Sequence, residues 1–496
     1  MIVLLSTLIS VFIVSIYLYF KWTYTYWKRH GFSCWITEFP YGSFGKEILY
    51  SINPGIQLKV VYDDVVKSNY KYIGTYLINV PRLLVVCPSL TKIMLQTDFT
   101  YFSDRGFYCN ESDPLSQNLF SIGGEKWRSV RSKLSTAFTA TKLKSMQPIL
   151  IQCGEDLRNI IREKCVSKEH VDIKDIAMSY NINVIASCGF GKECNCFLSD
   201  TEFKRQGIKV FNFSSTYRAL KVFIGILYPT FANRVGIKIF DKDSTTFFIN
   251  LLKETIEYRK QYNIIRYDMI QTMMELGSTF DDAEIKHLAA QVFVFFVAGF
   301  ETSTNALTFC LYEISMNLEI QEKLRKEIFL VLTKYDVLNY ESLLEMKYMD
   351  QVISETLRKY PPLMYISRTC VKDYCIPNTN TVLPKGTPVD FSILGLHHNP
   401  NYYAEPEKFD PERFSKTSKH DSYVYLPFGG GPRKCIGMQL GLMNMKTALT
   451  MLLSKFAFTL NKSTVEPIEC DPRSFTFAPK NKILLNAKVL NHDIMN

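Results

Sequence analysis

The sequence predicts a mainly α-helical protein with a smaller β portion, preceded by a single N-terminal transmembrane helix. Three observations lead to this fold class. Residues 2–20 are uncharged and mostly apolar, residues 100–360 repeat apolar side chains at three- and four-residue spacing, and β-branched runs bounded by Gly or Pro occur near both ends. At 496 residues the chain is about twice the size at which one hydrophobic core stops growing, so we expect one large domain or a few that share an interior.

The N-terminal apolar segment is long enough to cross a membrane. As a helix, residues 2–20 span about 28 Å, close to the thickness of the bilayer hydrocarbon. A cleaved signal peptide is the alternative, but it requires basic residues before the apolar run and a small-residue cleavage site, and neither is found here. We therefore expect a retained anchor over 2–20, a basic and aromatic linker over 21–45 and the main domain over 46–496 on the cytosolic side. The interfacial aromatic and basic side chains expected after the anchor are Trp22, Tyr24, Tyr26, Trp27, Lys21, Lys28 and Arg29.

Hydrophobic periodicity, helix-capping residues and prolines predict the positions of the other elements. The longest predicted helix starts with Asp281 or Asp282 as its cap and continues for more than thirty residues without Pro, and its apolar middle indicates a path through the interior. Pro361 and Pro362 end the helices before them, after which strands return. The remaining predicted strands are 57–67 and 82–88, and the remaining predicted helices are 125–138, 141–165, 244–263, 318–332, 344–360 and 437–456.

Charge and cysteine usage narrow the class of protein. The net charge of +10 is spread along the chain, so it favours anionic membranes or acidic protein partners and does not indicate nucleic acid. Thirteen cysteines form no Cys-x-x-Cys pair, which is typical of a reducing compartment. A cysteine that binds a metal in this chain therefore acts as a single protein ligand.

The most informative motif is the stretch PFGGGPRKCIG at residues 427–437. A phosphate-binding loop is excluded, because Lys434 is followed by Cys435 and not by Ser or Thr, and the glycine spacing does not fit. The glycines instead allow tight turns and a close approach to a flat ligand. Cys435 then stands just before a predicted helix, whose N-terminus lowers the pKa of a thiol, and Arg433 is suited to a carboxylate on the same ligand.

Phe428, Gly431, Arg433, Cys435 and Gly437 occur at the spacing F-x-x-G-x-R-x-C-x-G. This resembles the haem-binding signature of cytochromes P450, the haem-thiolate monooxygenases. The resemblance implies the fold of that family, haem b with its iron bound axially by Cys435, and O₂ as co-substrate. A thiolate ligand on haem iron favours cleavage of the O–O bond.

The predicted long helix contains AGFETST at residues 298–304. Glu301 and Thr302 place an acid beside an alcohol in an apolar wall, an arrangement that relays protons. The alternative is an exposed Glu and a Thr that bonds to its own helix, but a carboxylate among these apolar residues is costly to bury without a purpose. In cytochromes P450 this run crosses the oxygen-binding side of the haem, so Glu301 and Thr302 are the expected catalytic residues and Ala298 an expected haem contact.

Two further sets of motifs occur in the order of the family. Glu355 and Arg358 at i, i+3 in ETLR and Arg413 in PERF resemble the buried ion-pair network of the family, although a solvated surface pair is the reading from the sequence alone. Trp127 and Arg131 in WRSVR share one helix face. The resemblance implies contacts to the haem propionates from Trp127, Arg131, Arg368, Arg105 and Arg433, against the alternative of surface charges.

The resemblance also locates a substrate pocket and suggests a lipophilic substrate of modest size. The residues expected to line it are Phe107, Phe120, Ile122, Val294, Val297, Leu363, Met364, Phe475 and Phe477, each of which is ordinary core by composition alone. The runs AGFETS, DPERF and YWKRHG are most similar to insect microsomal members. Departures are a hinge after the anchor that keeps only Pro40, and Gln439 where many relatives carry Arg.

The chain contains no flavin or nicotinamide motif, so the resemblance implies electrons from NADPH through a membrane-bound NADPH–cytochrome reductase, with cytochrome b5 as a candidate second partner. Lys126, Arg128, Lys133 and Lys434 are candidates for the basic docking face. The expected location is the endoplasmic reticulum membrane. Two alternatives stay open: a haem-thiolate isomerase or dehydratase, which tends to lack the acid–alcohol pair, and a haem-binding protein without catalysis.

Overall fold

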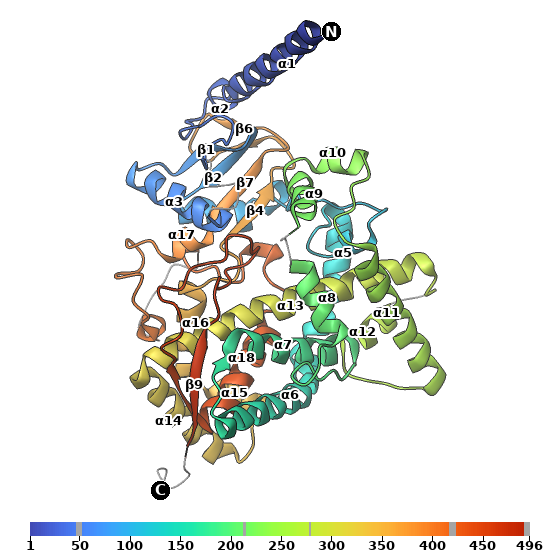
Figure 1. Cartoon of the computed structure of the whole chain (residues 1–496), viewed down its shortest axis with the longest axis vertical. Helices are drawn as coiled ribbons and strands as arrows, with labels where there is room; N and C mark the ends of the chain where they lie inside the picture. The colour runs from blue at the N-terminus through green and yellow to red at the C-terminus, as the bar shows by residue number, and fades with distance from the viewer. Residues whose placement is uncertain (46–51, 212–214, 277–278, 416–422, 491–496) are drawn as a thin grey trace. The chain divides into compact units, whose positions relative to one another are not determined.

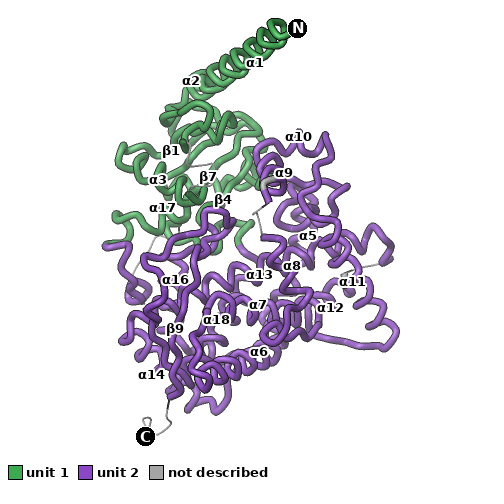
Figure 2. The backbone as a smooth tube through the Cα atoms, in the orientation of Figure 1, with its two compact units in different colours: residues 1–106, 364–404, 421–434 green, residues 107–363, 405–420, 435–496 purple. Residues whose placement is uncertain are grey.

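The computed structural model describes residues 1–45, 52–211, 215–276, 279–415 and 423–490. The chain forms two compact units, each built from separate stretches of sequence (Figure 2). Unit 1 comprises residues 1–106, 364–404 and 421–434, and unit 2 comprises residues 107–363, 405–420 and 435–496. Helices dominate and strands are few, so the predicted mainly α fold with a smaller β portion is confirmed.

Unit 1 is built on a four-stranded sheet in the order β1-β2-β7-β4. The central pair β2 and β7 is parallel, with Leu83 opposite Val389, and β4 runs antiparallel to β7, with Arg368 opposite Val389. The predicted strand over 82–88 is β2. The elements of unit 1 are α1 Ile2–Thr23, α2 Tyr26–Arg29, α3 Pro54–Lys67, β1 Tyr72–Leu77, β2 Val80–Val85, α4 Pro88–Lys92, the π-helix η2 Ile93–Thr97, the 3₁₀ helix η3 Phe99–Tyr101, β4 Tyr365–Thr369, β5 Tyr374–Cys375, β6 Val382–Leu383, β7 Pro388–Ser392, α17 Ile393–His397 and the 3₁₀ helix η7 Gly431–Arg433.

The N-terminal helix α1 is exposed along nearly its whole length and has the length and apolar composition of a membrane span (Figure 1). Its basic flank is in place, with the Arg29 guanidinium 4.4 Å from the centre of the Trp22 ring. Trp27, which we expected at a membrane interface, is instead fully buried: its ring packs on Gly74 of β1 and its Nε1 donates to the Thr75 carbonyl at 2.9 Å. The linker is therefore partly built into the hydrophobic core of unit 1, through Trp27 and Phe32.

The prediction of a strand over 57–67 is wrong, because this segment is helix α3. Asn53 caps the helix by accepting from Gly55 N at 2.9 Å, and Pro54 occupies the first turn, where its missing N–H is not needed. The buried residues Leu58, Val61, Tyr62 and Val65 follow helical spacing. The β-branched valines thus belong to an amphipathic helix. The sequence signal for this helix is the capping pair Asn53 and Pro54 before it.

Unit 2 is mostly helical and carries a small sheet in the order β3-β9-β8. Its elements are the 3₁₀ helix η4 Pro114–Ser116, α5 Gly124–Ser135, the 3₁₀ helix η5 Thr136–Phe138, α6 Ala140–Ser167, β3 Val171–Asp172, α7 Ile173–Phe190, α8 Glu202–Phe211, α9 Thr216–Leu227, α10 Pro229–Arg234, α11 Lys242–Tyr262, α12 Met269–Leu276, α13 Asp282–Met316, α14 Leu318–Tyr335, α15 Tyr340–Glu345, α16 Lys347–Lys359, the 3₁₀ helix η6 Pro411–Phe414, α18 Met438–Leu453, β8 Phe456–Leu460 and β9 Leu484–Val489. The helices predicted from periodicity are all present, with ends that differ by a few residues.

Helix α13 runs through the interior of unit 2 and packs against α7, α11 and α16 (Figure 1). Asp281 caps it by accepting from Glu284 N at 2.9 Å, as predicted. Gly299 permits the close approach to α7, since a Cβ at this position would lie 2.7 Å from Ile185 Cδ1. Although α13 is long and apolar enough to cross a membrane, much of it is buried, which is the behaviour of a core helix.

Candidate active site

The signature loop brings Cys435 to the start of α18. Gly437 is the N-cap of this helix, and Cys435 lies three residues before Met438, its first residue. The Cys435 side chain is exposed, so its sulfur is accessible to a ligand. Phe428, seven residues earlier, is half-buried. The predicted order of an aromatic wall, a glycine turn and an accessible thiol at a helix start is therefore present in the structure.

Position 431 in this loop requires glycine for two reasons, its backbone conformation and the closeness of another segment. Its φ of +66° lies in the left-handed region, and a Cβ would lie 1.8 Å from the Leu95 carbonyl oxygen of η2. Both constraints arise inside unit 1, from packing against the backbone of a neighbouring segment. The glycine is therefore needed to build the loop itself.

Three of the arginines expected to bind haem carboxylates belong to unit 1 and surround the segment 103–106. Arg433 is buried and donates from Nε to the Ser103 carbonyl at 2.8 Å, with Asp104 at 3.7 Å. Arg105 donates to the Arg433 carbonyl at 3.1 Å. The strand that carries Arg368 joins the same segment, because Thr369 N donates to the Asp104 carbonyl at 2.8 Å.

Arg368 provides a test of whether the chain fits a haem. Its side chain is only 2% exposed. Within the described residues it makes a single hydrogen bond, from NH1 to the Ser367 carbonyl, and its Nε has no acceptor. Burial lowers the pKa of the guanidinium to about 10. A buried cation without a carboxylate is unfavourable unless an anion accompanies it, so this site fits a ligand that carries negative charge.

Within unit 2, helix α5 carries the other two residues expected to contact the haem carboxylates. Trp127 is buried and Arg131, four residues later, is half-buried. Burial lowers the pKa of Arg131, and the nearby Cys435 opposes that shift, as expected for a thiolate close to a guanidinium. Gly437 also approaches this region, with its Cβ position 3.8 Å from the Phe138 ring. The structure thus brings Arg131 and Cys435 into one electrostatic environment.

The acid–alcohol pair lies in the middle of α13. Thr302 Oγ1 donates to the Ala298 carbonyl at 2.7 Å, which is the hydrogen bond of the alternative interpretation. The hydroxyl oxygen can still accept a hydrogen bond. Glu301 is half-buried and accepts from Asn305 Nδ2 and from Thr476 Oγ1, both at 3.2 Å. Burial raises the pKa of Glu301, and Lys174 together with these two hydrogen bonds opposes the shift.

The predicted ion-pair residues meet in the interior of unit 2. Arg358 Nε lies 2.7 Å from Glu355 Oε2, and both side chains are 0% exposed. Arg413 Nε is 3.4 Å from Glu355 Oε1, and Arg358 also donates to the Pro406 carbonyl at 2.7 Å. The arrangement is that of a buried network and not of a solvated surface pair.

The residues expected around a substrate are placed unevenly. Phe107 and Phe120 pack together with ring centres 5.0 Å apart, and Val294 and Val297 lie on α13 in the turns before Thr302, half-buried. Of the other expected residues, Ile122 is buried, Leu363 is half-buried and Phe475 is exposed. Met364 is buried against Gly55 of α3. Phe477 packs between Phe309 and Tyr360. Their shared role in a pocket stays a prediction.

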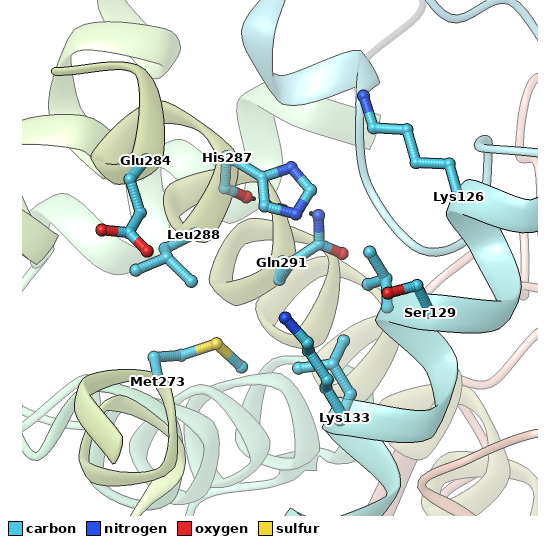
Figure 3. Close-up of a pocket in the computed structure, with 10 residues that line it drawn as sticks. Lys126, Ser129, Lys133, Met273, Glu284, His287, Leu288 and Gln291 are labelled. Atoms are coloured by element: carbon cyan, nitrogen blue, oxygen red, sulfur yellow. Dashed lines mark hydrogen bonds between the residues drawn. The ribbon is translucent and has the colours of Figure 1, made fainter. Parts of the chain in front are cut away.

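A pocket of about 310 Å³ lies elsewhere in unit 2, between α5, α12 and α13 (Figure 3). Lys126, Lys133 and His287 face it, and Lys126 donates to Gln117 Oε1 at 2.6 Å. Burial lowers the pKa of His287, and the two lysines lower it further. None of the predicted substrate contacts lines this pocket, whereas two residues of the predicted basic docking face do.

Two polar residues that contact Glu301, namely Asn305 and Thr476, were not predicted from the sequence. Asn305 stands one turn after Glu301, so i, i+4 spacing was the available signal for it. Thr476 stands between two predicted pocket residues, and only the fold brings it to α13.

Comparison with known proteins identifies a family. A family model described as Cytochrome P450 matches residues 48–486. The chain is 36% identical over 510 residues to cytochrome P450 6A1 of Musca domestica, covering 97% of each chain. It is 36% identical over 513 residues to cytochrome P450 6k1 of Blattella germanica, covering 97% of this chain and 96% of the relative. It is also 34% identical over 500 residues to probable cytochrome P450 6a13 of Drosophila melanogaster, covering 98% and 99%.

Proposed function

Because the chain belongs to the cytochrome P450 family and is thus a haem-thiolate monooxygenase, we propose that it inserts one oxygen atom of O₂ into a lipophilic small molecule, with electrons from NADPH. The observation that carries this proposal is the accessible Cys435 thiol at the start of α18, close to Arg131. Hydroxylation or epoxidation of a xenobiotic or of an endogenous lipid or hormone is the reaction class. Haem, when bound, would supply the iron and the redox chemistry by which O₂, two electrons and two protons yield an oxidised substrate and water.

Cys435 is the proposed iron ligand. Cationic Arg131 favours its thiolate form, which is the form that binds a metal. Buried Arg368 and Arg433, with Arg105 and Trp127, are the proposed partners of the haem carboxylates. Phe428, Gly437 and Ala298 are the proposed contacts to the ring.

Glu301 and Thr302 are the proposed proton-handling pair. Burial makes the carboxyl of Glu301 more basic than an exposed one, while its two hydrogen bonds hold it in place. Thr302, one residue later, is anchored to Ala298 with an oxygen still able to accept. Neighbouring groups of this kind hold and pass a proton in an otherwise apolar wall.

A membrane location supports a lipophilic substrate and a membrane-bound electron donor. Helix α1 is the proposed anchor in the endoplasmic reticulum membrane, with Trp22 and Arg29 at the interface and residues 46–496 as the cytosolic catalytic domain. The proposed donor is an NADPH–cytochrome reductase with an acidic face, and cytochrome b5 is a candidate second partner. Lys126 and Lys133 on α5 supply part of the basic face.

A carbon-monoxide difference spectrum tests the iron ligand. We expect Cys435→Ala to abolish the thiolate-type spectrum, and Cys375→Ala, which removes another exposed thiol, to leave it intact. A thiolate spectrum that survived Cys435→Ala would overturn the assignment. Product formation that needs NADPH, reductase and O₂ separates monooxygenation from the isomerase or dehydratase alternative, which needs none of them, and from a haem-binding protein, which yields no product.

A further inference from the structure

Two neutral side chains outside every sequence motif hold Glu301. Asn305 Nδ2 donates to Glu301 Oε1 at 3.2 Å, and Thr476 Oγ1 donates to the same oxygen at 3.2 Å. Asn305 Nδ2 also donates to Thr476 Oγ1 at 2.9 Å, so the three side chains are mutually connected. Asn305 and Thr476 are each 1% exposed. We call Glu301, Asn305 and Thr476 the Glu301 cluster; all of it lies in unit 2.

A further hydroxyl leads from the cluster toward solvent. Ser474 Oγ lies 3.1 Å from Thr476 Oγ1 and accepts from Thr476 N at 3.2 Å. Because the Thr476 hydroxyl proton is donated to Glu301, Ser474 is the donor in the bond between the two hydroxyls. Ser474 is only partly buried. The hydrogen bonds therefore run in one direction, from the surface of unit 2 through two hydroxyls to the carboxylate.

The cluster also contains an unsatisfied acceptor. Asn305 Oδ1 is buried and has no hydrogen-bond donor within the described residues. A buried polar atom without a hydrogen-bond partner is energetically unfavourable. Buried water molecules are the usual partners of such atoms in proteins. The amide that orients Glu301 thus offers a binding site for water beside the acid.

The electrostatics of the cluster suit an acid that changes its protonation state. Among the described residues, Lys174 of α7 is the charged side chain that acts electrostatically on Glu301, and its Nζ donates to the Pro479 carbonyl at 3.3 Å. Burial raises the pKa of Glu301, whereas Lys174, Asn305 and Thr476 oppose that rise. Burial thus favours the protonated carboxyl, whereas the lysine and the two hydrogen bonds favour the carboxylate.

On the basis of the proposed function, in which Glu301 supplies protons to the reaction, we propose that Ser474 and Thr476 form the route by which solvent protons reach Glu301, and that Asn305 holds a water molecule beside it. Ser474 takes a proton from a hydronium ion and releases its own to Thr476, which releases its own to Glu301. The net change turns carboxylate and hydronium into carboxylic acid and water. Asn305 moves no proton and is a positioning residue.

Thr476→Val removes the central hydroxyl at nearly constant volume. Infrared spectroscopy of the ferric holoenzyme between pH 4 and 9 follows the carbonyl band of protonated Glu301, identified by its loss in Glu301→Gln. We expect the midpoint to rise by about one pH unit in Thr476→Val, since one donor to the ionised form is lost. The ratio of product to NADPH consumed falls and the solvent deuterium isotope effect rises. Thr476→Ser restores all three.

The variant Ser474→Ala distinguishes a role in proton supply from a role in holding Glu301 in place. It leaves both donors to Glu301 in place, so the infrared midpoint is unchanged, while the product ratio still falls. Ser463→Ala, an exposed serine outside the route, changes neither. We expect a crystal structure of the holoenzyme to show a water molecule within hydrogen-bond distance of Asn305 Oδ1.

Three results would overturn the inference: normal coupling in both Thr476→Val and Ser474→Ala, an infrared midpoint that Thr476→Val does not move, or no water at Asn305 Oδ1. Failure of the proposed function is recognised separately. It would appear in the unsubstituted protein, as a missing thiolate spectrum or missing substrate oxidation, and the infrared titration depends on neither.

Discussion

Arg368→Met has effects of opposite sign on the haem-free chain and on haem binding. Within the described residues the buried guanidinium has a single backbone acceptor, and burial lowers its pKa to about 10. At 1.36 kcal/mol per pKa unit, the charged form is disfavoured in the folded chain by about 3 kcal/mol. This penalty is fully present at neutral pH, below both pKa values, and is relieved only as the pH rises above the folded-state value.

We therefore expect Arg368→Met to stabilise the haem-free protein against urea by about 1–3 kcal/mol, because an apolar side chain of similar length replaces an unpaired cation. The same substitution removes a charge-assisted hydrogen bond to a haem carboxylate, worth about 1.5–3 kcal/mol, so haem leaves roughly 10- to 100-fold faster. The assays are urea unfolding of the haem-free chain and transfer of haem to an apo-globin. Arg473→Met, at an exposed arginine, is the matched control. Destabilisation of the haem-free chain, or an unchanged rate of haem loss, would refute the reasoning.

Three further predictions concern stability, the signature loop and the anchor. Arg358→Met leaves the buried Glu355 charge without its main partner and costs about 3–5 kcal/mol in urea unfolding, whereas Lys334→Met, in an exposed pair, costs under about 1 kcal/mol; equal costs would contradict the buried network. Gly431→Ala abolishes the thiolate spectrum because of its positive φ and the carbonyl in the way, while Gly441→Ala, with open space around its Cβ, keeps it. Deleting residues 2–23 releases the protein from lipid vesicles in a flotation assay, and retention of most of the protein on the vesicles would argue against α1 as the main anchor.

The helical part of the fold was predictable because its signals are local. The long helix α13 has a capping Asp, an apolar middle and no Pro, and the structure has the same cap and nearly the same length. The strand predicted over 57–67 is wrong because the β-branched composition of the segment was given more weight than its helical periodicity. The Asn-Pro pair before the segment marks a helix start. The prediction that Trp27 lies at a membrane interface is wrong for a different reason. Its sequence neighbourhood is that of an interface, and only the pairing of residues 34–42 with β1 shows that it is covered.

The candidate site was predictable where one segment carries the chemistry. The signature loop and the acid–alcohol pair are contiguous in sequence, so their residue types and spacing were enough to name Cys435, Glu301 and Thr302. Thr476 lies 175 positions from Glu301, and the hydrogen bond between them follows from the course of the chain. The reason that Gly431 must be glycine is likewise set by the backbone of a distant residue, Leu95.

The buried charges of this chain differ in how completely they are paired, and that difference separates structural from functional roles. Glu355 and Arg358 satisfy each other and two further groups, so their site is complete within the chain and serves stability. Within the described residues, Glu301 accepts from two neutral donors that hold its position, and Lys174 acts on it electrostatically without forming an ion pair. Arg368 has, in the part of the chain that the structure describes, one backbone acceptor and no acidic partner. A folded chain retains such incompletely paired charges at a cost in stability, and the cost is offset when a proton or an anionic ligand completes the site.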